Sequence, residues 1–262
     1  MPFLGYPKRE QISPKFMPTI LFNGIPFPHI SAVIWDKDGT LADTVEYWRV
    51  VGHQRVRRLD AQIPGIGAPL QAAFGLTDGT LAPGGLLAVG SRYENEIAAA
   101  AYIAEQGWDW RSALKMAQDV FRQVEQECPQ IKTIPIHLEG RKTLGQIAQA
   151  GYKQAILSAD LTVNVQAFVQ HNELHDLLDY HTGIDVGPTK PDPEPLYKVC
   201  TVLGLEPAQV VMVGDSPVDL EMARRAGCAG AIGVSWGFHP SQGLAPLADT
   251  VLTDWSQIQV LP

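Results

Sequence analysis

The sequence has few cysteines and no long apolar run. Its three cysteines, Cys128, Cys200 and Cys228, are scattered and lack CxxC spacing, so they signal neither a disulfide framework nor a zinc site. No stretch has the length of a membrane span, and residues 1–10 contain prolines and charges instead of the apolar segment of a signal peptide. We therefore expect a protein of the reducing cytoplasm that has no membrane partner.

Dense runs of basic residues are also missing. The 262 residues carry a net charge of −8, with no long Lys/Arg segment in either half. This pattern lacks the electrostatic footprint of a nucleic-acid-binding protein, so we expect no nucleic-acid partner, and any bound anion must be held by local groups. A chain of this length that is 45% hydrophobic can bury a large core, in one large domain or two moderate ones.

The central feature of the sequence is an apolar run, residues 32–35, that leads directly into Asp36, Lys37, Asp38 and Gly39. An apolar run that ends in carboxylates is typical of a buried parallel strand that stops at a polar site. Alternation along an extended chain predicts that Asp36 and Asp38 point to one side and that Lys37 points away from them. A simple turn explains the same residues about equally well, so the later segments must decide.

Two later segments each supply a group that suits an anion. Ser158 ends a predicted strand, residues 152–158, where its hydroxyl would cap the following helix, and a capped helix start also favours negative charge. Lys190 is followed by alternating prolines, residues 191–195, which stiffen the loop. A surface lysine usually has no specific role. Because Lys190 lies on a stiff loop between the segment that ends in Ser158 and the next acidic strand end, we favour a phosphate contact for it.

A third segment, residues 210–219, ends an apolar run with Gly214 and Asp215. Ser216 and Asp219, with a proline at the first helical position between them, match the pattern of a helix capping box. The capping box does not explain Asp215. An acid at a strand end, with a second acid four residues later, is a good place to hold a hard cation through carboxylate oxygens.

The order of these patterns predicts the domain organisation. Strands alternate with helices in residues 31–43 and 134–262, which predicts an α/β core with a parallel sheet. Residues 44–133 are mostly helical in pattern, and we expect them to form a helical domain inserted into this core. In residues 1–30, an Asn-Gly pair between apolar runs predicts a small hairpin, and an interaction arm is an equally open alternative.

Helical periodicity within the insert is strongest in residues 45–59, 92–106 and 110–127. A loop rich in glycine and proline separates the first two, broken by a short apolar turn at residues 70–74. After the insert we expect a helix over residues 144–150 and, near the end of the chain, two final strands. These strands cover residues 229–234 and 249–252.

The first expected helix carries a cluster of basic residues. A solvated charged face is the favoured interpretation of this cluster, and contact with an anionic substrate is the alternative. Its members are Arg49, His53, Arg55, Arg57 and Arg58.

The four strand-end segments, taken in order, resemble the four motifs of the haloacid dehalogenase superfamily. The resemblance covers nearly all of residues 31–262. A helical insert directly after the first motif resembles the capped subclass that includes phosphoglycolate phosphatase and β-phosphoglucomutase. This resemblance implies a Rossmann-like parallel sheet core with a mobile α-helical cap domain. Lys37 departs from the family pattern, because capped relatives usually have an apolar residue at that position.

The resemblance also implies roles for individual residues. Asp36 is implied to be the nucleophile that forms an aspartyl-phosphate, and Asp38 the general acid and base. Mg²⁺ is implied to bind the Asp36 carboxylate, the Asp38 backbone carbonyl and Asp215, with Asp219 in a supporting position. The residues implied to surround the phosphoryl group are Thr40, Ser158 and Lys190.

The implied function is a Mg²⁺-dependent phosphatase that hydrolyses a small phosphorylated metabolite, such as phosphoglycolate or a sugar phosphate. Two alternatives stay open: a phosphomutase of the β-phosphoglucomutase type, which would use the same residues, and a non-catalytic phosphate-binding relative. A dehalogenase is disfavoured, because it needs neither the acid at Asp38 nor a metal pair that includes Asp215. The motifs do not specify the substrate or the oligomeric state.

Overall fold

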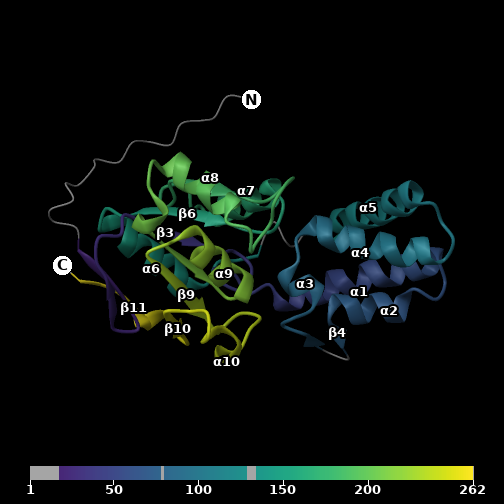
Figure 1. The fold of residues 1–262 in the computed structure, drawn as a ribbon, viewed down its shortest axis with the longest axis horizontal. Coiled ribbons are helices and arrows are strands. Elements are labelled where there is room, and N and C mark those ends of the chain that lie inside the picture. Colours follow the sequence, from purple (N-terminus) through teal and green to yellow (C-terminus); the bar gives the residue numbers. More distant parts are fainter. Residues whose placement is uncertain (1–17, 78–79, 129–133, 262) are drawn as a thin grey trace.

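The core of the protein is a six-stranded parallel sheet with strand order β10-β9-β8-β3-β6-β7 (Figure 1). The computed structural model describes residues 18–77, 80–128 and 134–261. The strands are β3 (Ala32–Trp35), β6 (Lys153–Leu157), β7 (Tyr180–Thr182), β8 (Val210–Gly214), β9 (Gly230–Val234) and β10 (Thr250–Leu252). The predicted α/β fold with a Rossmann-like parallel sheet is therefore confirmed.

Helices cover both faces of this sheet, which explains why β3 and β8 are buried throughout. On one face, Val33 and Trp35 share a hydrophobic cluster with α6 (Leu138–Gln149) and α7 (Thr162–His171). On the other face, Ala32 and Ile34 pack with α8 (Glu194–Leu203) and α9 (Pro217–Ala226). Successive residues of β3 thus enter opposite cores, as expected for a strand with two buried faces.

The strand register brings the ends of three strands to the same edge of the sheet. Trp35, the last residue of β3, lies opposite Ile156 of β6 and Val213 of β8. The chain leaves all three strands in the same direction, so the residues that follow them are neighbours. In open parallel sheets, this carboxyl edge is where ligands bind.

A second group of helices forms a separate lobe beside that edge (Figure 1). We call residues 45–127 the helical lobe. Its helices are α1 (Val45–Gln62), α2 (Gly67–Phe74), α3 (Leu86–Val89), α4 (Arg92–Glu105) and α5 (Trp110–Glu127). Two short antiparallel strands, β4 (Leu76–Thr77) and β5 (Thr80–Leu81), lie between α2 and α3 in the chain. These elements share a hydrophobic cluster of their own, which includes Phe238 from the core.

The structure differs from the sequence-based expectations in two helices. The short turn expected at residues 70–74 is the end of helix α2, which tolerates Pro69 in its first turn and buries Leu70 and Phe74. Helix α6 begins at Leu138, six residues before the expected start at residue 144. Gly140 lies against the Trp255 ring there, and this contact was invisible to the sequence pattern because Trp255 is distant along the chain.

A small antiparallel sheet packs against the core on the side away from the helical lobe (Figure 1). Strand β1 (Thr19–Phe22) pairs with β2 (Ile25–Phe27) and with β11 (Ile258–Leu261), a strand that the sequence analysis did not identify. Asn23 and Gly24 form the turn, both with positive φ angles (51° and 77°). The rest of the expected N-terminal extension, residues 1–17, lies outside the described residues.

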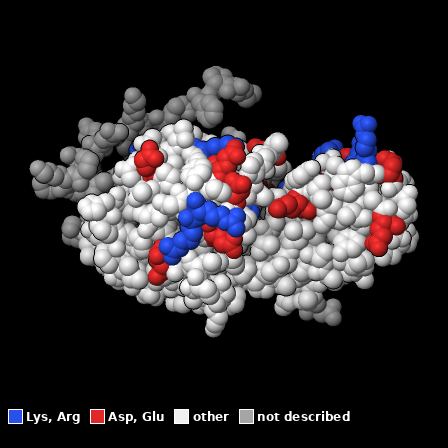
Figure 2. Space-filling view, viewed as in Figure 1, with Lys and Arg blue, Asp and Glu red and all other residues white. Residues whose placement is uncertain are grey.

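Charged side chains on the face drawn in Figure 2 lie in mixed groups, with acidic residues beside basic ones. This arrangement agrees with the absence of long basic runs in the sequence. Within the described part of the chain, no helix is both long enough and apolar enough to span a bilayer.

Candidate active site

Lys190 bridges the carboxylate of Asp36, at the end of β3, and that of Asp219, in the first turn of α9. Its Nζ lies 2.7 Å from Asp36 Oδ1 and 2.6 Å from Asp219 Oδ1. All three side chains are buried. Burial alone would lower the pKa of Lys190, but the two carboxylates hold it above its ordinary value, so the ammonium stays charged.

Asp36 also belongs to a group of acids that suits a divalent cation. Asp36, Asp215 and Asp219 each offer a carboxylate oxygen, and these oxygens lie within 4.8 Å of one another. Burial raises the pKa of Asp36 from 3.8 to about 6, opposed by Lys190. Burial and the neighbouring acids also raise the pKa of Asp215 well above its ordinary value. Three buried carboxylates around one ammonium leave excess negative charge, and oxygen ligands of this kind fit Mg²⁺.

Asp215 is held tightly by the loop that follows β9. The Phe238 backbone N–H donates to Asp215 Oδ2 at 2.6 Å. A Cβ atom added at Gly39 or Gly237 would come within 2.2 Å or 2.3 Å of the same oxygen. Backbone therefore approaches Asp215 from two sides, and both positions need glycine. The sequence analysis identified Asp215 but not the roles of Gly237 and Phe238.

Asp38 lies beside a different cation from Asp36. Lys37 Nζ is 2.7 Å from Asp38 Oδ1 and 3.2 Å from Asp160 Oδ2. Lys37 and Asp160 are buried, and Asp38 is partly buried. The expectation that Lys37 points away from the acids was wrong. The strand ends at Trp35, so strict alternation no longer applies at Lys37, and Asp160 supplies a buried partner for its ammonium.

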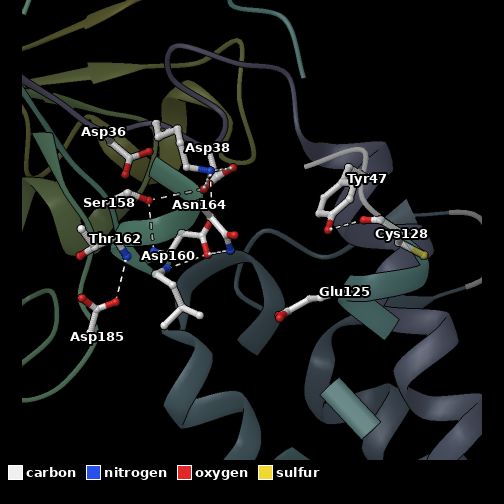
Figure 3. A network of polar contacts seen from close by, with 12 residues as sticks. Asp36, Asp38, Tyr47, Glu125, Cys128, Ser158, Asp160, Thr162, Asn164 and Asp185 are labelled. Carbon is white, nitrogen blue, oxygen red and sulfur yellow. Dashed lines mark hydrogen bonds and ion pairs between the residues drawn. The ribbon is translucent and has the colours of Figure 1, made fainter. Parts of the chain in front are cut away.

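Ser158 lies at the end of β6, as expected, but it does not cap the following helix. Its Oγ accepts a hydrogen bond from the Asp160 N–H at 3.1 Å and lies 3.5 Å from Asp38 Oδ2 (Figure 3). Helix α7 begins at Thr162, and its N-cap is Leu161, three residues after the predicted cap position. The hydroxyl thus borders Asp38 instead of the helix start.

These groups line a pocket between the core and the helical lobe. Its volume is about 60 Å³, which suits a small ligand. The core contributes the strand-end residues already described, including Asp36, Asp38, Ser158, Lys190 and Asp215. The lobe contributes a facing wall that the sequence analysis did not identify. That wall consists of Trp48, Arg55, Leu87, Ala88, Val89, Gly90, Arg92 and Asn95.

Comparison with known proteins identifies the family. The profile of the haloacid dehalogenase-like hydrolases matches residues 30–227, which include every strand-end residue of the pocket. This chain belongs to the haloacid dehalogenase-like hydrolase family. The resemblance predicted from the four motifs is therefore confirmed.

Several relatives of this haloacid dehalogenase-like hydrolase are named as phosphatases. The probable phosphatase IndB of Dickeya dadantii is 31% identical over 234 residues, covering 85% of this chain and 88% of that protein. The phosphoglycolate phosphatase of Pasteurella multocida is 36% identical over 120 residues, so the match spans 45% of this chain and about half (53%) of that enzyme.

A solved structure shares the fold of this hydrolase. The predicted phosphoglycolate phosphatase from Haemophilus somnus 129pt superimposes with a TM-score of 0.64 at 20% identity, covering 87% of this chain and 96% of that one. At this level of identity, the likeness concerns the fold alone.

One expected site residue of the hydrolase is absent from the pocket lining. Thr40 is fully buried and is not among the residues that line the pocket. Its carbonyl oxygen accepts a hydrogen bond from Trp236 Nε1 at 3.0 Å. This contact ties the turn after β3 to the loop after β9, so the observed contact of Thr40 is a structural one.

Proposed function

We propose that this hydrolase releases phosphate from small phosphomonoesters in a Mg²⁺-dependent reaction that passes through an aspartyl-phosphate on Asp36. The observation that carries the proposal is the position of Asp36. Its carboxylate lies at the end of β3, in the pocket, beside Lys190 and close to Asp215, with which it could share a cation. The phosphatase names of the relatives support the same reaction class.

In the first half of this reaction, an Asp36 oxygen forms a bond to phosphorus while the bond from phosphorus to the ester oxygen breaks. Asp38 gives a proton to the departing oxygen, which leaves as an alcohol. In the second half, Asp38 takes a proton from a water molecule whose oxygen attacks phosphorus, and phosphate leaves as Asp36 is restored. Ser158 and Lys190 would donate hydrogen bonds to the phosphoryl oxygens.

Charge explains why a cation belongs in this proposal. Two negative charges 4 Å apart repel by about 4 kcal/mol at an effective dielectric constant near 20. A phosphate dianion beside Asp36 and Asp215 would meet several such repulsions, more than Lys190 alone can offset. Asp36, the Asp38 backbone carbonyl and Asp215 would hold Mg²⁺, while Asp219 orients Lys190. The bound ion would stabilise the negative charge on the transferring group.

The direct test is a Mg²⁺-dependent screen for phosphate release over small phosphorylated metabolites, including phosphoglycolate and sugar phosphates. We expect release that excess EDTA abolishes and that Asp36→Asn abolishes. The matched control is Asp43→Asn, an exposed acid seven residues along the chain, which should keep full activity. Full activity in Asp36→Asn or in EDTA contradicts the proposal, and isomerisation of a sugar phosphate without net phosphate release would indicate a mutase.

A further inference from the structure

The two walls of the pocket carry different charges. Apart from Lys190, which already pairs with Asp36 and Asp219, the charged residues of the core wall are aspartates. On the lobe wall, the charged residues are Arg55 and Arg92. An anionic group that extends from the phosphoryl site would be repelled by the core wall, so its electrostatic partners lie on the helical lobe.

Arg55 is the one member of the basic cluster on α1 that enters the pocket lining. The expectation of a solvated face was wrong for this residue, because its side chain is 2% exposed. The guanidinium carbon lies 4.1 Å from the Phe121 ring centroid, which fixes the plane of the group. Arg55 Nε is buried and has no hydrogen-bond partner among the described residues.

Arg92 lies at the start of α4 and shares a counter-ion with Arg55. Both guanidinium groups contact the same carboxylate oxygen, Oε1 of Glu125, and Arg92 Nε also donates to Glu96 at 2.6 Å. Neither glutamate lines the pocket. Glu125 extends from α5 toward the core-side residues in Figure 3. The glutamates therefore pair with the two arginines from outside the pocket lining, and the arginines are the charged lobe residues within it.

We propose that Arg55 and Arg92 form a subsite for a second anionic group, so that the preferred substrate is a short phosphomonoester with a carboxylate or second phosphate on its leaving group. This proposal rests on the proposed function and extends it to substrate class. Arginine presents planar pairs of N–H donors that match oxyanions. The core wall and the lobe wall line the same small pocket, so a short substrate can place one anionic group at each wall.

The test compares two substrates of the same shape with the wild-type protein and Mg²⁺. One is phosphoglycolate, and the other is its analogue in which a neutral carboxamide replaces the carboxylate. Charge-assisted hydrogen bonds to an anion predict a kcat/KM ratio of about tenfold or more in favour of phosphoglycolate. Ethylene glycol bisphosphate is the third substrate, and we expect its kcat/KM also to exceed that of the amide; a value no higher than that of the amide would overturn the second phosphate as a group that the subsite binds. Phosphate release from both glycolate compounds with a ratio near one overturns the subsite but leaves the proposed function intact.

Variants then assign the discrimination to residues. Arg92→Gln and Arg55→Met should lower the phosphoglycolate-to-amide ratio by about tenfold, while Arg92→Lys keeps part of it. The matched control is Arg58→Gln. Arg58 lies on α1, as Arg55 does, and it also pairs with a glutamate, but it is outside the pocket lining. A purely structural role would lower both kcat/KM values together and leave the ratio unchanged, which overturns the assignment. Absence of phosphate release from any wild-type reaction overturns the proposed function, and the subsite with it.

Discussion

Asp36 and Asp38 are two residues apart, yet each is paired with its own lysine. Asp36 contacts Lys190, and Asp38 contacts Lys37. In both cases the ammonium also reaches a further aspartate, so each lysine holds two carboxylates. The two carboxylates to which we assign chemistry thus have different ion-pair partners, which suits different roles as nucleophile and proton carrier.

Removing Lys37 should destabilise the fold, because Asp38 and Asp160 would lose their shared counter-ion inside the protein. Breaking a buried ion pair from one side costs about 3–5 kcal/mol. We expect Lys37→Met to lower the free energy of unfolding by an amount in this range, measured by urea denaturation. Adding Asp160→Asn to Lys37→Met should recover part of the loss. Strict additivity of the two changes would contradict a direct interaction.

Asp36 should make stability depend on pH. Without divalent cations, its pKa is about 6 in the folded protein and 3.8 in the unfolded chain. Between these pH values the folded state binds more protons, so this residue lowers the free energy of unfolding as pH rises from about 4 to about 6. We expect the free energy of unfolding of the wild type, minus that of Asp36→Asn, to fall as pH rises across this range in urea titrations with EDTA. A constant or rising difference would show that burial does not raise this pKa.

At the scale of elements, the loop after β9 fixes one side of the proposed cation site. A methyl group at Gly237 would lie 2.3 Å from Asp215 Oδ2 and 2.2 Å from the Gly39 carbonyl oxygen. We expect Gly237→Ala to displace the Asp215 carboxylate and to raise the Mg²⁺ concentration for half-maximal activity about tenfold. Gly243→Ala is the control, because a Cβ there meets nothing within 4 Å. Equal Mg²⁺ requirements in the two variants would refute this role for the loop.

The elements that could be predicted from sequence are those whose signal is local. Apolar runs that end in Asp36, Ser158 and Asp215 indicated strands, and parallel pairing then placed their ends at one edge. The capping box of Ser216 and Asp219 is present as predicted, because it needs only a few consecutive residues. The structure brings these strand-end residues into one pocket.

What sequence reasoning missed depends on partners that are distant along the chain. Lys37 is buried because Asp160 lies beside it, and Arg55 is buried because Phe121 and Glu125 surround it. A charged residue in isolation indicates a solvated surface, and only tertiary contacts reverse that expectation. Strand β11 was missed for a similar reason, since its pairing partner is β1 at the other end of the described chain.

At the scale of the whole molecule, the pocket lies between the core and the helical lobe and is lined by residues of both. The core supplies the groups that suit phosphoryl transfer, and the helical lobe supplies Arg55 and Arg92. Phe238 connects the two, since its ring packs in the lobe cluster while its N–H bonds to Asp215. This arrangement predicts that substitutions of pocket residues in the core change the rate of the chemical step, and that substitutions of pocket residues in the lobe change the preference between substrates.

The central claim is that the Asp36 carboxylate becomes phosphorylated during turnover. The most direct measurement quenches a Mg²⁺-dependent reaction in acid, reduces the trapped acyl phosphate with borohydride, and maps the modified residue by peptide mass spectrometry. The account predicts homoserine at position 36, formed only with substrate and Mg²⁺. Steady phosphate release with the modification at another residue, or with none at position 36, would contradict it.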